Sequence, residues 1–230
     1  MRALDDLLAA SRWADALSAT QLQRVRTTIF VREVQPGNFV CHKGERSSVW
    51  IGVIDGLIKV ANLSEDGRAV TFAAFPAFCW FGEGSLLKDE QRKYDVVAMR
   101  SSRVALMPAV TFFWLLDNSI SFNRFILNQL NERLGQFLSA FEHDRLDDRE
   151  ARVAHALADM LQLYPSRECR IEISNEELGH LVGASRPRIS QALQVLEKSG
   201  LIKIGYRTIT VLNIEGLRNF PPRGANNFRQ

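Results

Sequence analysis

The sequence has few of the features that mark secreted or membrane-spanning proteins. It contains only three cysteines, Cys41, Cys79 and Cys169, and their odd number and wide spacing exclude a disulfide framework. No apolar run approaches the roughly 18 residues that would suggest a membrane span. The N-terminus places Asp5 and Asp6 where a signal peptide has its basic and apolar regions. We therefore expect a cytoplasmic protein that does not act at a membrane.

Sequence motifs of common enzymes are also missing. The chain has no Gly-rich phosphate loop followed by Lys and Ser or Thr, no His-Glu-x-x-His and no Gly-x-Ser-x-Gly. Gly82-Glu83-Gly84 alone is too weak a pattern to indicate a phosphate loop. We predict that the protein is not an enzyme, with no catalytic residues and no metal ligands.

The basic side chains gather toward the C-terminus. The net charge is only +3, and residues 1–147 carry 17 basic and 17 acidic side chains. From residue 178 onward the count is eight basic against two acidic. A basic excess at one end is typical of a protein that binds a polyanion such as DNA, although chance clustering on a solvated surface is an equal alternative from charge alone.

The periodicity of apolar residues divides the chain into three stretches. Residues 3–27 repeat at helical spacing. Residues 28–107 form short β-branched and aromatic runs separated by turn residues, among them the hairpin signal Asp55-Gly56, and this pattern predicts a small all-β barrel or roll. Helical spacing returns near Val110, and the acid-rich segment 144–150 is the predicted boundary to the last domain, where Asp147 or Asp148 would cap a new helix.

A narrow apolar stripe runs along the predicted helix after residue 110. Its members recur at spacings of 3, 4, 3 and 4, namely Leu127, Leu130, Leu134, Phe137 and Phe141. The alternative to a dimer seam is a helix packed on its own domain. A stripe of two positions per heptad is narrow for that role and suits a partner helix. We therefore predict a homodimer that forms through this helix.

The segment 171–211 carries the most specific pattern. Ser174 and Glu177 form a predicted capping box at the start of a short helix that ends at Gly183. Ser185 offers a second N-cap, and Pro187 is tolerated in the first turn of the helix that follows. Two short helices joined by a Gly-containing turn indicate a helix-turn-helix.

The second of these helices is predicted to read DNA. Its polar face presents Arg and Gln side chains, which pair with guanine and adenine edges in the major groove. The segment 201–211 resembles a β-hairpin wing whose basic side chains contact phosphates. The predicted DNA-binding residues are Ser185, Arg186, Arg188, Ser190, Gln191, Lys203 and Arg207.

The order of these parts resembles the CRP/FNR family of bacterial regulators over nearly the whole chain. The similar motifs are Pro36-Gly37, Lys43-Gly44-Glu45, Asp55-Gly56, Phe81-Gly82-Glu83 and the segment 177–188. The resemblance implies an α+β fold with a cyclic-nucleotide-binding-like β-roll (1–109), a dimerisation helix (110–146) and a C-terminal winged helix-turn-helix (147–230). It also implies a homodimer on two-fold symmetric double-stranded DNA that works as an activator with RNA polymerase. The alternative is a cyclic-nucleotide-binding regulatory module without DNA binding.

The effector is where the chain departs from the cyclic-AMP-binding members of the family. Their phosphate cassette begins Gly-Glu, as Gly82-Glu83 does here, and ends Arg-Ser, where this chain has Arg92-Lys93. The family's pair of base-contacting hydroxyls falls on Phe137 and Leu138, which offer no hydrogen bond. The resemblance therefore implies a small-molecule effector but does not favour cyclic AMP.

Other effector classes are also constrained by the residues. The first 40 residues contain no cysteine, so the resemblance implies no iron–sulfur cluster. His42, Cys79 and His143 are candidate haem ligands in residue type alone. The aromatic residues of segment 75–81 either line an effector pocket or pack under the roll. The sequence leaves these alternatives open.

Overall fold

The computed structural model describes residues 2–63, 69–144, 149–163 and 169–221. The chain divides into two compact units, Met1–Glu132 with Leu163–Pro165, and Arg133–Gln162 with Ser166–Gln230. Each unit is described by itself below. Over the described residues, no helix combines the length and the apolar character needed to cross a membrane.

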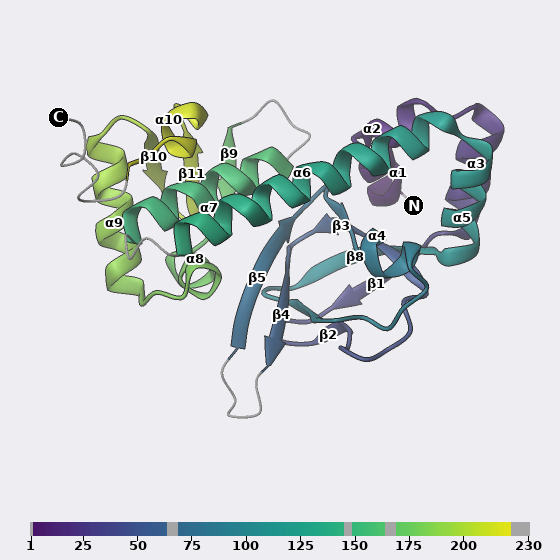
Figure 1. The fold of residues 1–230 in the computed structure, drawn as a ribbon, viewed down its shortest axis with the longest axis horizontal. Helices are drawn as coiled ribbons and strands as arrows, with labels where there is room; N and C mark the ends of the chain where they lie inside the picture. Colours follow the sequence, from purple (N-terminus) through teal and green to yellow (C-terminus); the bar gives the residue numbers. More distant parts are fainter. Residues whose placement is uncertain (1, 64–68, 145–148, 164–168, 222–230) are drawn as a thin grey trace. The chain divides into compact units, whose positions relative to one another are not determined.

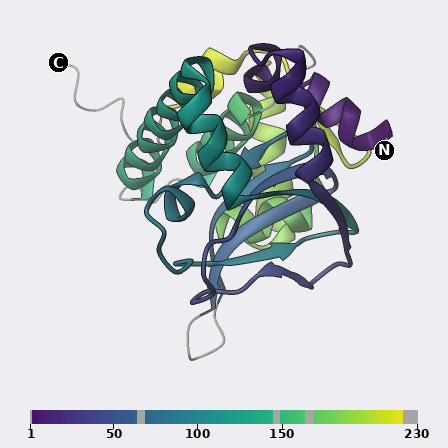
Figure 2. The same cartoon turned by 90° about the vertical axis from the view of Figure 1, so that its right-hand side faces the viewer.

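The first unit is a β-roll with helices gathered on one side of it (Figures 1 and 2). The roll has two four-stranded sheets, ordered β1-β8-β3-β6 and β2-β7-β4-β5. The elements in chain order are α1 (Arg2–Ala9), α2 (Arg12–Asp15), α3 (Ala19–Thr28), β1 (Phe30–Val34), β2 (Phe39–Cys41), β3 (Val49–Asp55), β4 (Leu57–Leu63), β5 (Ala69–Pro76), β6 (Trp80–Phe81), α4 (Glu83–Leu87), β7 (Asp95–Ala98), β8 (Ser102–Pro108), α5 (Ala109–Asn118) and α6 (Ile120–Asp144).

The sheet that contains β3 is covered on both faces. Ile51 and Val53 point into the core between the two sheets, where they meet Ile58 and Val96 of the other sheet. Trp50 alternates with them and points to the opposite face, into a core shared with the N-terminal helices. Burial on both faces explains why β3 is almost continuously apolar rather than alternating.

The Asp55-Gly56 turn does not form the hairpin that the sequence predicts. β3 pairs with β6 and β8, whereas β4 pairs with β5 and β7, so the turn carries the chain from one sheet to the other. Asp55 accepts hydrogen bonds from the backbone N–H (3.1 Å) and Nε (2.6 Å) of Arg103 on β8. Gly56 adopts φ +94°, and a Cβ there would lie 2.1 Å from Oγ of Ser102. The conformation of the turn is therefore determined by contacts with β8 and not by pairing between β3 and β4.

The stretch of helical spacing over residues 3–27 consists of three helices. α3 begins at a capping box in which Ser18 and Gln21 exchange hydrogen bonds of 2.9 and 3.2 Å. The helices enclose an aromatic cluster in which Trp13 lies 5.2–5.6 Å, between ring centroids, from Trp50, Trp80 and Phe122. This apolar packing anchors the start of α6 to the helical side of the unit.

The second unit contains a small three-stranded sheet and short helices. The sheet has the order β10-β11-β9, in which β11 pairs antiparallel with both neighbours. The predicted N-cap residues Asp147 and Asp148 lie outside the described residues. The elements after α6 are α7 (Arg149–Leu163), β9 (Arg170–Glu172), α8 (Asn175–Val182), α9 (Arg186–Lys198), β10 (Ile202–Gly205), β11 (Thr208–Val211) and α10 (Ile214–Arg218).

Candidate functional site

Helices α8 and α9 form the helix-turn-helix that the sequence predicts. The Ser174 backbone N–H donates to Oε2 of Glu177 (2.7 Å), and the Glu177 N–H donates to Oγ of Ser174 (3.2 Å), so the capping box is present. Gly183 ends α8 in the left-handed region at φ +69°. A Cβ on Gly179 would lie 2.5 Å from the carbonyl oxygen of Ala184, so the turn between the helices requires glycine at 179.

The second helix, α9, buries one face and exposes the other. Ile189, Ala192, Leu193 and Leu196 are buried in the core of the unit. Ser185 occupies the N-cap position as predicted, but its side chain accepts no capping hydrogen bond from the described backbone. The predicted reader side chains on the opposite face are exposed, with Ser190 half-buried, and they are Ser185, Arg186, Arg188, Ser190 and Gln191.

The β10–β11 hairpin forms the wing beside this helix. The backbone N–H of Ile204 donates to Oε1 of Glu197 on α9 (2.7 Å), which ties the wing to the reader helix. Lys203 and Arg207 are exposed, and Tyr206 at the tip is 90% exposed. The alternation of Ile171-Glu172-Ile173 indicates a short strand but not its partner, and in the structure β9 pairs with β11 as the third strand of the wing sheet.

An acidic residue that the sequence analysis did not single out lies next to Arg186. Glu176, in the first turn of α8, forms an ion pair through Oε2 with Nη2 of Arg186. The two side chains are 53% and 66% exposed, respectively. Their sequence separation matches no local helical pairing, and only the helix-turn-helix geometry brings them together. A carboxylate therefore shares the exposed surface of the predicted reader helix.

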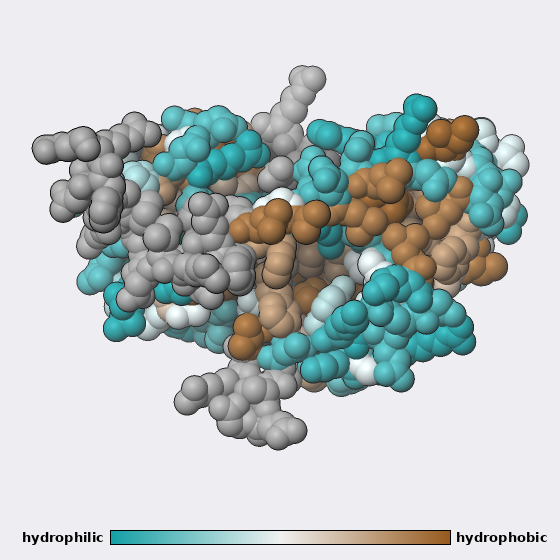
Figure 3. All heavy atoms as spheres, in the orientation of Figure 1, coloured by the Kyte–Doolittle hydropathy of each residue, from teal (hydrophilic) through white to brown (hydrophobic). Residues whose placement is uncertain are grey.

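Helix α6 exposes most of the predicted dimer stripe. Leu127, Leu134 and Phe137 are exposed, and so is Leu138. Leu130 is half-buried and packs against the core of the first unit. The side chain of Phe141 lies outside the described residues. Figure 3 shows hydrophobic residues exposed over α5 and the first part of α6, where Val110 and Ile120 are also exposed.

Within the β-roll, three of the predicted effector residues, Gly82, Glu83 and Arg92, are buried. Gly82 stands at φ +92° before α4, and Glu83 is 1% exposed and accepts a hydrogen bond from Nε1 of Trp50 (3.3 Å). Arg92 is 2% exposed, and its Nη2 donates to the Val49 carbonyl oxygen (2.8 Å). Its Nη1 has no hydrogen-bond partner among the described residues. The arginine is therefore part of the packing of the roll, and it keeps one buried N–H group that no described residue accepts.

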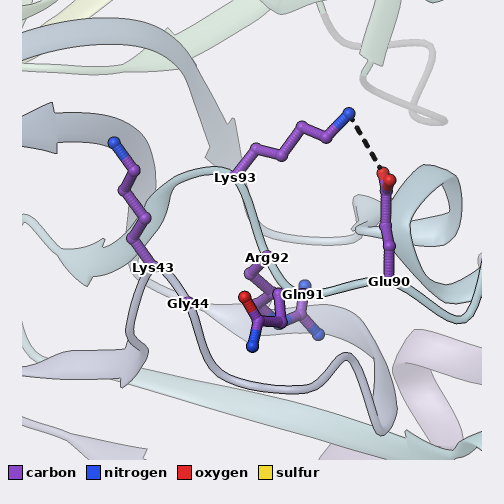
Figure 4. A pocket seen from close by; sticks show the side chains of 6 residues that line it. All are labelled: Lys43, Gly44, Glu90, Gln91, Arg92 and Lys93. Atoms are coloured by element: carbon purple, nitrogen blue, oxygen red, sulfur yellow. Dashed lines mark ion pairs between the residues drawn. The ribbon is translucent and has the colours of Figure 1, made fainter.

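Lys93 points away from this interior. Its Nζ lies 3.3 Å from Oε1 of Glu90, and Nζ of Lys88 lies 3.5 Å from the other oxygen of that carboxylate. Figure 4 shows Lys93 directed to Glu90 at the rim of an open depression, with Lys43 on its other side. The two adjacent residues at the end of the cassette therefore have different surroundings, since Arg92 is buried and Lys93 lies at the surface.

Cys41 on β2 is a neighbour of Arg92 that the sequence analysis did not connect to this site. Burial raises the pKa of the Cys41 thiol above its ordinary value. The positive charges of Arg92 and Arg32 lower the pKa of the thiol and only partly offset the effect of burial. The thiol is therefore protonated at neutral pH and stands beside the buried guanidinium.

The aromatic residues of segment 75–81 are largely packing residues. Phe75 and Phe81 stack with centroids 4.2 Å apart in the roll core, and Trp80 lies in the helical core. Nε1 of Trp80 donates to Oγ of Ser11 (2.8 Å). Of the candidate haem ligands, Cys79 is buried in the roll core, His42 stacks on Phe39, and the side chain of His143 lies outside the described residues. These contacts favour the packing alternative over an aromatic effector pocket.

Comparison with known proteins matches both units to described domains. Residues 31–119 match the cyclic nucleotide-binding domain, and residues 151–220 match the Crp-like helix-turn-helix domain. The first match indicates a small-molecule effector. The second match is to a DNA-binding domain and argues against a regulatory module that lacks DNA binding.

Curated relatives cover most of the chain. The chain is 29% identical to the HTH-type transcriptional regulator Cmr of Mycobacterium tuberculosis, over 83% of this chain and 76% of that protein. It is 25% identical to the cAMP-activated global transcriptional regulator CRP of Pasteurella multocida, over 74% of this chain and 84% of that protein. Both relatives are transcription regulators and not enzymes.

Solved structures share the fold. FixK2 from Bradyrhizobium japonicum superposes with a TM-score of 0.64 at 19% identity, covering 86% of this chain and 99% of that one. The catabolite activator protein of Thermus thermophilus superposes with a TM-score of 0.51 at 21% identity, covering 90% of this chain and 98% of that one. Together with the two domain matches and the curated relatives, the winged helix-turn-helix and the β-roll show that this chain belongs to the CRP/FNR family of DNA-binding transcription regulators.

Proposed function

We propose that the protein is a homodimeric transcription activator that binds a two-fold symmetric operator, with its DNA affinity set by a small anionic effector in the β-roll. The observation that carries the proposal is the exposed polar face of α9 beside the wing, on a helix whose other face is buried. This arrangement matches the docking of a recognition helix in the major groove.

The exposed side chains divide into base readers and phosphate contacts. Arg186 lies in the first turn of α9, where a guanidinium can donate two hydrogen bonds to guanine, and Gln191 follows as a second candidate for a base contact. Three further residues lie at the same end of the helix and suit contacts with the sugar–phosphate backbone of DNA, namely Ser185, Arg188 and Ser190. Lys203 and Arg207 on the wing suit phosphates, which position the protein without reading sequence.

The two kinds of contact can be separated by mutation and salt. We expect Arg186→Ala to reduce the binding free energy for an operator, obtained by selection from random DNA, by about 1–3 kcal/mol. Binding to random DNA should be reduced much less. Arg207→Ala should weaken both DNAs nearly equally and lower the salt-dependence slope by about two units per dimer. Fluorescence anisotropy across a salt series measures both. Equal weakening of the two DNAs by Arg186→Ala would remove its assignment as a base reader.

The exposed stripe of α6 supports dimerisation. The apolar residues Leu127, Leu134 and Phe137 are exposed at heptad spacing. Exposure of this apolar surface to water is unfavourable, and packing against a partner helix would bury it. Leu130 is half-buried in its own unit, so Leu134 is the cleaner position to test. Leu134→Asp should give a monomer in sedimentation velocity. Leu212→Asp, at another exposed leucine, should leave the dimer intact, and a dimeric Leu134→Asp protein would contradict the proposed seam.

The proposed effector carries a negative charge and differs from cyclic AMP. The buried Nη1 of Arg92 supports an anionic group, whereas Lys93, Phe137 and Leu138 stand where cyclic-AMP binders have hydroxyls. Mass spectrometry of small molecules released from the purified protein should identify an anion, and calorimetry should find no tight binding of cyclic AMP. Micromolar cyclic AMP binding that also improves operator affinity would show that the exclusion of cyclic AMP is wrong.

Activation is tested by transcription in vitro. We expect purified protein to raise transcript yield by RNA polymerase from a promoter with the selected operator upstream, and the Arg186→Ala variant to lose this effect. Lower transcript yield with the operator in that position would mean that the protein represses.

A further inference from the structure

The ion pair between Glu176 and Arg186 joins the two helices of the helix-turn-helix on their exposed surface. Oε2 of Glu176 accepts from Nη2 of Arg186, so the guanidinium proposed to read guanine is already held by a carboxylate of its own chain. An arginine has five N–H donors, and one held at Nη2 leaves the donors of Nη1 and Nε available. The contact therefore fixes the direction of the guanidinium without using up its hydrogen-bonding capacity.

Two adjacent glutamates at the start of α8 have different roles. Glu177 is 6% exposed and closes the capping box, so it belongs to the fold. Glu176 is 53% exposed and takes no part in the hydrogen bonds of that box. Both carboxylates are favoured in the first turn by the helix dipole, but the cap needs only Glu177. Replacing Glu176 should therefore leave the helix-turn-helix folded.

The position of Glu176 also places a negative charge where DNA is densely negative. The first helix of such a motif crosses the sugar–phosphate backbone, and a carboxylate there is repelled by phosphates. This repulsion opposes every DNA sequence equally. The hydrogen bonds from an oriented guanidinium to guanine offset it only on the correct sequence. An exposed ion pair is weak in water, and it strengthens where the interface excludes water.

We propose that Glu176 is a specificity-determining residue, which positions Arg186 for guanine and lowers the affinity for DNA that lacks this base. The inference rests on the proposed role of Arg186 as a base reader. Glu176 acts through Arg186 and through charge repulsion, and it reads no base itself.

The test is Glu176→Gln in the full chain, which removes the charge and keeps the size of the side chain. Anisotropy titrations use the selected operator and random DNA of equal length. We expect affinity for random DNA to rise several-fold and the ratio of operator to random affinity to fall about ten-fold. The matched control is Glu215→Gln, an exposed glutamate paired with Arg218 on α10, which removes the same charge and should leave the ratio unchanged.

A double mutant separates positioning from charge alone. In the Arg186→Ala background, we expect Glu176→Gln to change affinity for both DNAs by the same factor, so that its effect on the ratio disappears. A Glu176→Gln protein whose ratio is unchanged, or higher than that of the original, would overturn the inference. If Arg186→Ala itself leaves the ratio unchanged, the base-reader assignment fails first. If Arg186→Ala lowers the ratio and Glu176→Gln does not, only the role of Glu176 fails.

Discussion

The β-roll and the helix-turn-helix each contain an arginine with a proposed ligand, which is an anion for Arg92 and a DNA base for Arg186. The two arginines differ in burial. Arg92 is 2% exposed and donates to the backbone of β3. Arg186 is 66% exposed and touches its own chain through an exposed carboxylate. We therefore expect removal of Arg92 to disturb the fold together with any ligand site, and removal of Arg186 to disturb only the proposed recognition of DNA.

The largest expected effect separates these two arginines. Arg92→Ala should lower the free energy of unfolding of the roll by about 3 kcal/mol, because it leaves a cavity and an unpaired Val49 carbonyl. Arg186→Ala should change it by less than about 0.5 kcal/mol. All four tryptophans lie before residue 115, so their fluorescence in a urea titration reports on the first unit and on Arg92→Ala, and circular dichroism of the whole chain is recorded alongside it to report on Arg186→Ala in the second unit. Equal midpoints for the two variants would contradict the comparison.

A glycine in each region gives the second contrast. Gly179→Val would force a side chain against the Ala184 carbonyl oxygen, at a cost of about 2–3 kcal/mol to the helix-turn-helix, with loss of operator binding. Gly84→Ala in the roll is a milder change and should be tolerated, because beyond its chain neighbours and its own helix the new Cβ would meet no described heavy atom within 4 Å. Operator titration and hydrogen exchange of α8 measure the difference. Normal operator affinity in Gly179→Val would refute the tight turn.

A substitution in the wing should change the stability of the second unit and its affinity for DNA in opposite directions. Arg207 adopts φ +51°, which is unfavourable for a residue with a Cβ. Arg207→Gly should raise the stability of the second unit by about 0.5 kcal/mol and weaken both operator and random DNA. Lys203→Ala should lower the affinity for DNA by a similar factor without raising the stability of the second unit. Thermal melting followed by circular dichroism, with DNA titrations, checks both variants.

The smallest effect concerns the thiols of the two regions. Burial raises the pKa of Cys41, so less of it is thiolate at pH 8, whereas Cys169 in the second unit is exposed. Iodoacetamide should therefore alkylate Cys169 before Cys41, and the rate at Cys41 should still be rising as pH passes its ordinary thiol value. Peptide mass spectrometry over a time course follows each site. Faster alkylation of Cys41 would place its thiol outside the buried environment described here.

Local features of the fold were predictable because short-range interactions produce them. The capping box of Ser174 and Glu177 spans three residues, and the alternation of apolar and polar positions in α9 follows helical periodicity. The strands that precede residue 76 also follow their turn signals. The same reasoning failed at Asp55-Gly56, because a turn signal does not show whether the next strand pairs with the last or joins another sheet.

Contacts between distant residues were decided by packing. Arg92 and Val49 are 43 residues apart, and Arg186 and Glu176 are 10 apart across a turn. From their residue types alone, these arginines are candidates for an anion site and for a DNA-binding surface. Residue types do not show that one guanidinium is buried against a strand while the other is held by a carboxylate at the surface. Side-chain direction and burial depend on the path of the whole backbone, and periodicity records only the local part of that path.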